Sequence, residues 1–181
     1  TDEDNYAIYA QSTFAQTQRL LAFGRDVSTK YTRRNRKEYE KIADYIGAVT
    51  EAQQGNYMVF FPSYRLMQDV YEVFAGKAAD SCEILMQHSN MKEHEREAFL
   101  EEFEKERQGT LVAFCVMGGI FGEGIDLKND RLIGAIIVGT GLPQIGSERE
   151  ILKEYYDRKK QSGFDYAYRY PGLHKVLQAA G

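Results

Sequence analysis

The sequence has few cysteines and no long hydrophobic run. Its two cysteines, Cys82 and Cys115, lie in apolar surroundings without the spacing of a metal site. Such thiols indicate buried side chains rather than a disulfide framework or a zinc centre. No apolar segment approaches the roughly 20 residues that span a bilayer, and no signal peptide opens the chain. We therefore expect a cytoplasmic protein with no membrane partner. Because the three histidines also lack metal spacing, we expect no metal ligands.

Positive charge is also scarce. The 23 lysines and arginines are outnumbered by 27 aspartates and glutamates, which gives a formal net charge of -4. Such a chain has no overall attraction for nucleic acid. Residues 25–41 are mainly basic, however, whereas residues 93–106 are mainly acidic. A local positive lining is sufficient to hold a single strand, although a run of charge is equally expected on an ordinary solvated surface.

Short apolar runs alternate with amphipathic segments along the chain. Strands are expected at residues 20–23, 57–61, 84–86, 111–116 and 132–138. Helices are expected between them, because apolar residues recur there at helical spacing. Strands alternating with helices of about ten to fifteen residues indicate βαβ units and a mainly parallel sheet. The predicted fold class is therefore α/β, with the layering of RecA-like or flavodoxin-like domains.

Several residues predict where helices begin. Ser63 follows a predicted strand, and its hydroxyl can accept a hydrogen bond from a free amide of the next helix. Asn90 with Glu93, and Ser147 with Glu150, have the spacing of a capping box. The helix after Ser147 is expected to be buried through Ile151, Leu152, Tyr155 and Tyr156. The last helix has Pro171 in its first turn. Its expected buried stripe is Leu173, Val176, Leu177 and Ala180.

Residues 116–127, V-M-G-G-I-F-G-E-G-I-D-L, form the most distinctive stretch of the chain. The stretch follows a buried apolar strand and so leaves the carboxyl edge of the sheet, where ligands of open α/β proteins bind. Gly119 and Gly124 have the spacing of a P-loop, but Ile125 stands where the phosphate-binding lysine is required. The dinucleotide fingerprint fails as well, because Leu127 occupies the place of its third glycine. Taken alone, the stretch is either a ligand-binding loop or a glycine-rich turn with solvated acids.

Three segments together resemble a known family. G-G-I-F-G-E-G-I-D-L at residues 118–127, with G-A-I-I-V-G-T-G-L-P after it, resembles motif V and the following strand of the XPD/DinG family of superfamily 2 DNA helicases. Residues 55–65, G-N-Y-M-V-F-F-P-S-Y-R, resemble motif IV, and residues 170–181, Y-P-G-L-H-K-V-L-Q-A-A-G, resemble the approach to motif VI. The resemblance implies that residues 20–181 are the second RecA-like motor domain, a three-layer sandwich, and that residues 1–19 connect it to a preceding domain.

The resemblance also implies which residues contact DNA. In motif IV, Ser63 and Tyr64 would face the single strand, where a hydroxyl and the first amides of a helix can bind a phosphate oxygen. The alternative is that Ser63 is only a helix cap and Tyr64 only a rim residue. In motif V, Gly118 and Gly119 would bring the backbone of the loop against the DNA backbone.

Other positions are implied to face the nucleotide. Glu123, Asp126 and Gln178 would be the catalytic residues there, and the two carboxylates would accept hydrogen bonds from a ribose, an ordered water or an interdomain arginine. Gln178 corresponds to the motif VI glutamine, which points toward the γ-phosphate. The remaining nucleotide-binding and interdomain positions are Gly122, Gly124 and Gly181. In the family an arginine follows, so we expect the domain to be truncated within motif VI.

The sequence contains no phosphate-binding G-K-T or G-K-S and no D-E-A-H-like box. ATP and Mg²⁺ are therefore expected to be held mainly by the first motor domain of the same polypeptide. The implied parent is an ATP-dependent DNA helicase that moves 5′ to 3′ on single-stranded DNA, with this chain a monomer that is inactive alone. Two alternatives remain open, an inactive nucleic-acid or protein binding module of the same fold and a flavodoxin-like or Rossmann-like cofactor enzyme.

Overall fold

A parallel sheet forms the centre of the protein. The computed structural model describes residues 20–121 and 131–180. Within these ranges every strand pairing is parallel, and the strand order is β2-β3-β1-β4. The strands are β1 (Asn56–Phe61), β2 (Cys82–Met86), β3 (Thr110–Val116) and β4 (Gly134–Ile137). The predicted α/β class with a mainly parallel sheet is therefore confirmed.

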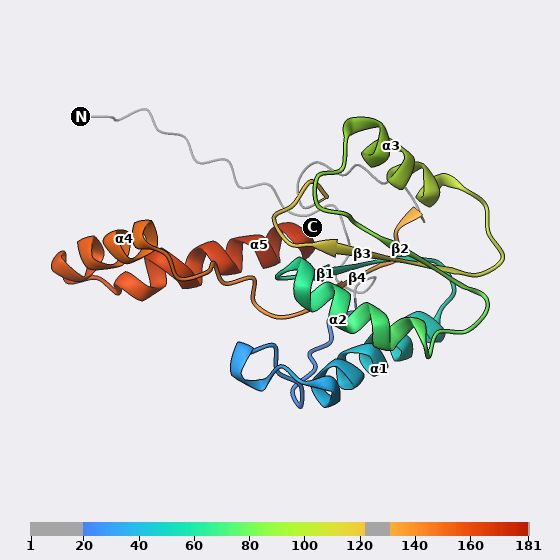
Figure 1. The fold of residues 1–181 in the computed structure, drawn as a ribbon, viewed down its shortest axis with the longest axis horizontal. Coiled ribbons are helices and arrows are strands. Elements are labelled where there is room, and N and C mark those ends of the chain that lie inside the picture. Colours follow the sequence, from blue (N-terminus) through green and yellow to red (C-terminus); the bar gives the residue numbers. More distant parts are fainter. Residues whose placement is uncertain (1–19, 122–130, 181) are drawn as a thin grey trace.

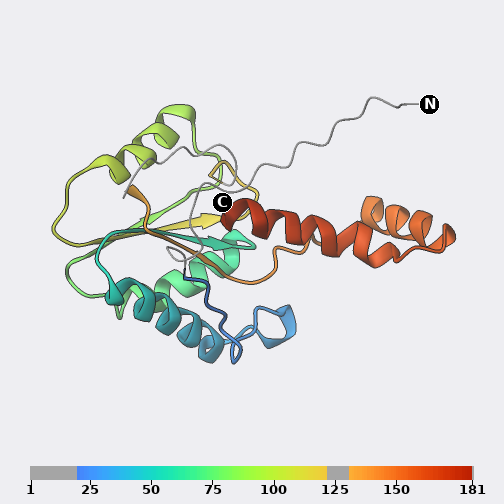
Figure 2. The same ribbon diagram turned by 180° about the vertical axis from the view of Figure 1, so that it is seen from behind.

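Helices cover both faces of the sheet, which gives three layers (Figures 1 and 2). One face carries α1 (Arg36–Ala52) and α2 (Tyr64–Ala75), and the other carries α3 (Glu93–Glu101) and the end of α5 (Tyr170–Ala180). Helix α4 (Ser147–Arg158) and the start of α5 extend beyond the sheet, as Figure 1 shows. The shorter helices are η2 (Tyr31–Arg33), η3 (Glu102–Glu104) and the π-helical η5 (Asp165–Arg169).

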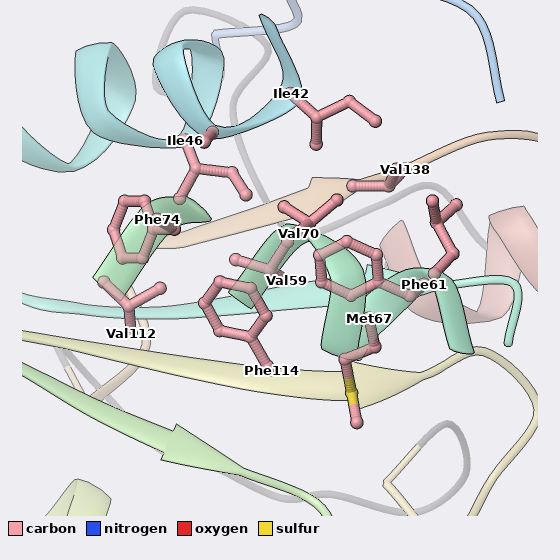
Figure 3. Packing of buried hydrophobic residues seen from close by; sticks show 12 residues of the cluster. Ile42, Ile46, Val59, Phe61, Met67, Val70, Phe74, Val112, Phe114 and Val138 are labelled. Carbon is pink, nitrogen blue, oxygen red and sulfur yellow. The ribbon is translucent and has the colours of Figure 1, made fainter. Parts of the chain in front are cut away.

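A hydrophobic cluster on each face holds the layers together. Along β1, Val59 and Phe61 belong to the cluster beneath α1 and α2, whereas Met58 and Phe60 belong to the cluster on the α3 side. The ring of Phe61 stacks on that of Phe114 in β3 with 5.2 Å between centroids, and Figure 3 shows both rings among side chains from α1 and α2. Because β1 and β3 are buried on both faces, they read in the sequence as uninterrupted apolar runs.

Two local predictions near the surface were wrong. Residues 20–23 form no strand, and the side chains of Leu20 and Phe23 are 92% and 77% exposed. The capping box expected at Asn90 is displaced, because Asn90 has a φ of +73° and the cap of α3 is Lys92. The backbone N–H of Lys92 donates to Glu95 Oε2 at 2.7 Å. The helix therefore begins two residues later than a cap at Asn90 would place it.

The predictions for α4 and α5 were right about the helices and largely wrong about their buried faces. Helix α4 begins at Ser147, one residue earlier than a cap at Ser147 would place it, because its cap is Gly146 without a side-chain hydrogen bond. None of its residues is buried. In α5 the buried residues are Gly172 and Ala179, whereas Leu173 and Leu177 are 51% and 60% exposed. Val176 is partly buried against the cluster on the α3 side, as predicted. At each end of the stripe the buried residue is one position earlier than predicted, about 100° around the helix. The physical reason is that most of this pair of helices lies beyond the sheet.

Candidate functional site

The loops that carry the predicted DNA contacts leave the sheet from neighbouring strands. In the register of the sheet, Phe61 at the end of β1 pairs with Val116 at the end of β3. After β1 the chain enters α2 on one face, whereas Phe121 after β3 packs into the cluster on the opposite face. In open α/β proteins the usual ligand position is the crevice at the carboxyl ends of two adjacent parallel strands whose connections go to opposite faces. We therefore take the carboxyl ends of β1 and β3 as the candidate site and refer to this position as the crevice.

Ser63 caps α2 at this crevice. Its Oγ accepts a hydrogen bond from the backbone N–H of Leu66 at 3.3 Å, and its backbone is extended with φ -161° and ψ 153°. The capping role predicted from the sequence is therefore confirmed. A hydroxyl that accepts from a helix amide still has its own proton to donate, so the cap and a phosphate contact are compatible.

Tyr64 begins α2 at the rim of the crevice and is 39% exposed. Its hydroxyl oxygen accepts a hydrogen bond from Gln87 Nε2 at 3.0 Å. Partial burial raises the pKa of the Tyr64 hydroxyl above its ordinary value of 10.0, against an opposing effect of the Gln87 hydrogen bond. The hydroxyl is therefore protonated at neutral pH.

Gln87, which sequence reasoning missed, connects the two predicted DNA-binding segments. It directly follows β2 and is 2% exposed. Its Oε1 accepts from the backbone N–H of Val116 at 2.9 Å, while its Nε2 donates to Tyr64. Its position immediately after an apolar strand marks a polar residue at a strand end, but neither its burial nor its two partners can be read from the sequence.

The described glycines of motif V are packed against side chains of this protein. Gly118 has a φ of +66°, and a Cβ there would lie 3.1 Å from Lys175 Cε of α5. Gly119 closes a turn by donating its N–H to the carbonyl oxygen of Val116 at 3.1 Å. A Cβ at Gly119 would lie 3.0 Å from that oxygen and 3.1 Å from Gln87 Nε2. Both positions therefore require glycine for the packing of the loop itself.

Of the remaining predicted site residues, the structure describes only Gln178. Gln178 lies in the last turn of α5 and is partly buried, next to the buried Ala179. Five positions, Gly122, Glu123, Gly124, Asp126 and Gly181, lie outside the described residues. Their roles stay predictions.

Residues 25–41 place basic side chains beside the end of β4. A Cβ at Gly139, just after β4, would lie 2.6 Å from Thr29 Oγ1, so this segment packs against that strand end. Three of the cations are paired within the segment, in Arg33–Glu38 at 2.9 Å, Arg36–Glu40 at 3.1 Å and Lys41–Asp26 at 4.0 Å. Arg34 donates to the carbonyl oxygen of Thr29 at 3.3 Å. The positive charge available to a partner is therefore smaller than the sequence indicates.

A depression of about 420 Å³ lies between the start of α2 and the residues after β2. Its polar lining comprises Tyr64, Arg65, Gln68, Gln87, His88 and Ser89.

In the part of the chain that the structure describes, no three His, Cys, Asp or Glu side chains are grouped to hold a metal ion. Both cysteines are free, and burial raises the pKa of the Cys115 thiol far above its ordinary value. Among the described helices, none has the length and apolar character needed to cross a membrane.

Comparison with known proteins identifies the family. Residues 46–181 match the family model of the helicase C-terminal domain, Helicase_C_2. This match extends over more than half of the chain, which therefore belongs to that family. Two solved structures have the same fold, one described as "XPD_APO" with 21% identity and a TM-score of 0.64, and one described as "XPD_Helicase" with 22% identity and a TM-score of 0.66. These findings confirm the resemblance to the XPD/DinG helicases.

The matched structures are much longer than this chain. Each alignment covers 85% of this chain but only 30% of the "XPD_APO" chain and 27% of the "XPD_Helicase" chain. The chain thus corresponds to one part of each of those proteins.

Proposed function

We propose that this chain is the second motor domain of an ATP-dependent DNA helicase that moves 5′ to 3′ on single-stranded DNA. It binds the strand at the crevice between β1 and β3 and completes an ATP site whose phosphate and Mg²⁺ ligands belong mainly to a first motor domain of the same polypeptide. The observation that carries the proposal is the junction of motif IV and motif V at one strand crevice through Gln87, in a chain of the helicase C-terminal domain family.

The groups at the crevice suit a phosphate backbone rather than a base. The Ser63 and Tyr64 hydroxyls can each donate a hydrogen bond, and Lys175 of α5 adds a positive charge beside Gly118. Hydroxyls, amides and cations are the usual partners of phosphate oxygens and carry no sequence information. The proposed grip is therefore independent of base sequence, as a motor that moves along DNA requires.

On the nucleotide side, the proposal assigns hydrogen-bond acceptors rather than cations. Glu123 and Asp126 accept hydrogen bonds from a ribose, a water or an interdomain arginine, and Gln178 faces the γ-phosphate. The proposal also assigns Gly122, Gly124 and Gly181 to nucleotide binding and interdomain contact. ATP supplies the free energy for movement, while Mg²⁺ neutralises its phosphates.

The two alternatives differ from this proposal in observable ways. The described strands have the order β2-β3-β1-β4, whereas the first four strands of flavodoxin-like and Rossmann-like sheets have the orders 2-1-3-4 and 3-2-1-4. The strand order and the family therefore favour a motor domain over a cofactor enzyme. An inactive binding module of the same fold would bind DNA without any ATP hydrolysis by the parent protein.

Two variants, each lacking one positive charge at opposite ends of the parallel β-strands, test the proposed position of the DNA strand. In the parent protein, Lys175→Ala should weaken single-stranded DNA binding and lower the slope of log affinity against log salt by about 0.7, the value for one lost phosphate contact. Lys77→Ala is the matched control, because Lys77 follows the far end of α2 and pairs with Asp44 at 2.6 Å. Fluorescence anisotropy of a labelled oligonucleotide over a salt series provides both quantities. Equal effects of the two variants would contradict the proposed position.

A further inference from the structure

Gln87 has a fixed orientation because both ends of its side-chain amide are engaged. The backbone N–H of Val116 can only donate, so the atom that meets it at 2.9 Å is the amide oxygen. The amide nitrogen consequently faces Tyr64 at 3.0 Å. Burial of Gln87 to 2% exposure leaves water little access to either end.

This orientation determines what the Tyr64 hydroxyl can do. An amide nitrogen donates and does not accept, so the hydroxyl oxygen is the acceptor in this pair and its proton must point elsewhere. The Tyr64 hydroxyl can donate that proton to the carbonyl oxygen of His88, which lies 3.5 Å from the hydroxyl oxygen. Hydrogen bonds between oxygens are usually about 2.5–3.0 Å long. The proton is therefore available to a better acceptor.

We propose that Gln87 is a positioning residue that directs the hydroxyl proton of Tyr64 outward, toward a phosphate oxygen of the bound strand. Tyr64 lines the depression of about 420 Å³ together with Arg65, Gln68 and Ser89, so an acceptor bound there can reach its hydroxyl. Through its bond to Val116, the same side chain fixes where the glycine-rich loop begins. One buried amide thus holds motif IV and motif V in register with each other. The inference rests on the proposed function, because the acceptor is the strand that the motor grips.

Gln87→Glu reverses the direction of the hydrogen bond to Tyr64 and leaves the shape of the side chain nearly unchanged. The carboxylate has nearly the same size and still accepts from Val116, but it cannot donate to Tyr64. The Tyr64 hydroxyl must then donate inward, and its proton is lost to the strand. Two hydrogen-bond donors favour the ionised carboxyl and burial opposes it, so binding is measured at about pH 8, where the ionised form is favoured over that at lower pH.

The experiment is a double-mutant cycle in the parent protein, read as the dissociation constant for single-stranded DNA and as the kcat and KM(DNA) of ATP hydrolysis. Tyr64→Phe should weaken DNA binding about tenfold, the loss expected for a hydrogen bond to a charged group. Gln87→Glu should weaken it by a similar factor, with KM(DNA) raised, while the buried carboxylate lowers the melting temperature. Gln87→Glu should add nothing in the Tyr64→Phe background, because the hydroxyl through which it acts is then absent.

Gln68→Glu is the matched control for charge. It places a new carboxylate in the same depression, on an exposed residue. Its effect should be the same with and without the Tyr64 hydroxyl. The inference is overturned if Gln87→Glu binds DNA like the wild type, or if its effect persists in the Tyr64→Phe background. It is overturned too if Gln87→Glu lowers kcat and leaves KM(DNA) unchanged, since Gln87 would then not act through the contact with the strand. If the wild-type parent neither binds DNA nor hydrolyses ATP, the proposed function is wrong and the inference falls with it.

Discussion

Glu38, in the first turn of α1, fixes the loop that precedes this helix through two hydrogen bonds. Its side chain is 7% exposed, and its carboxylate accepts from the backbone N–H of Ser28 at 2.8 Å and from Arg33 Nη2 at 2.9 Å. The Ser28 hydrogen bond is the main cause that holds the pKa of Glu38 below its ordinary value of 4.5, with burial opposing it and Arg33 assisting. One carboxylate therefore fixes a loop that packs beside the end of β4.

The depressed pKa of Glu38 predicts an acid-sensitive contribution to stability. Because the folded state holds the carboxylate ionised, this contribution is complete above 4.5 and is lost as the pH falls through the lower folded-state pKa. The difference in unfolding free energy between wild type and Glu38→Gln should be constant near neutral pH and shrink under acid, as urea unfolding at several pH values would measure. Glu40→Gln, which removes an exposed partner of Arg36, should cost about 0.5 kcal/mol or less. A Glu38→Gln difference that is independent of pH would contradict the assignment.

The site could be predicted at the residue scale only where its cause is local. Ser63 was predictable because a cap needs only the amide of Leu66, three residues away. Gln87 was not, since its side-chain partners lie 23 and 29 residues away in the sequence. A buried amide between two strand ends becomes visible only when the parallel pairing of β2 with β3 is known.

At the scale of elements, the strands of the sheet and the helices were predictable, whereas the strand expected at residues 20–23 does not form and the placement of α4 and α5 was not predictable. Uninterrupted apolar runs identify β1 and β3, because only a sheet covered on both faces buries every residue of a strand. An amphipathic stripe shows which face of a helix is apolar, but not which element covers it. Ile151 at 68% exposure and Leu177 at 60% are apolar positions that no described element covers completely.

The observed buried face of α5 can be tested with two identical substituents. Leu177→Gln should change the unfolding free energy by about 0.5 kcal/mol or less, because the side chain is 60% exposed. Ala179→Gln should cost about 1–3 kcal/mol, because Ala179 is 8% exposed and packs in the cluster on the α3 side. Chemical denaturation of both variants gives the comparison. A larger loss for Leu177→Gln would instead support the stripe predicted from the sequence.

At the scale of the whole molecule, the net charge of -4 argues against general attraction to nucleic acid. The proposed DNA contacts are mainly neutral hydrogen-bond donors at the carboxyl edge of the sheet, Ser63 and Tyr64, with the positive charge of Lys175 beside them. In the proposed function, this domain supplies only part of the ATP site. The few contacts that it makes alone are too weak to offset the free-energy cost of association. ATP hydrolysis by the proposed motor therefore requires the other motor domain.

Steady-state ATP hydrolysis, with and without single-stranded DNA, tests this requirement most directly. The account predicts that residues 20–181 alone hydrolyse no ATP, whereas the parent protein with its first motor domain hydrolyses ATP and is stimulated by DNA. In the parent, Glu123→Gln or Asp126→Ala should lower the DNA-stimulated rate while the melting temperature stays unchanged. DNA-stimulated turnover by residues 20–181 alone, or a parent protein that binds DNA and hydrolyses no ATP, would contradict the account.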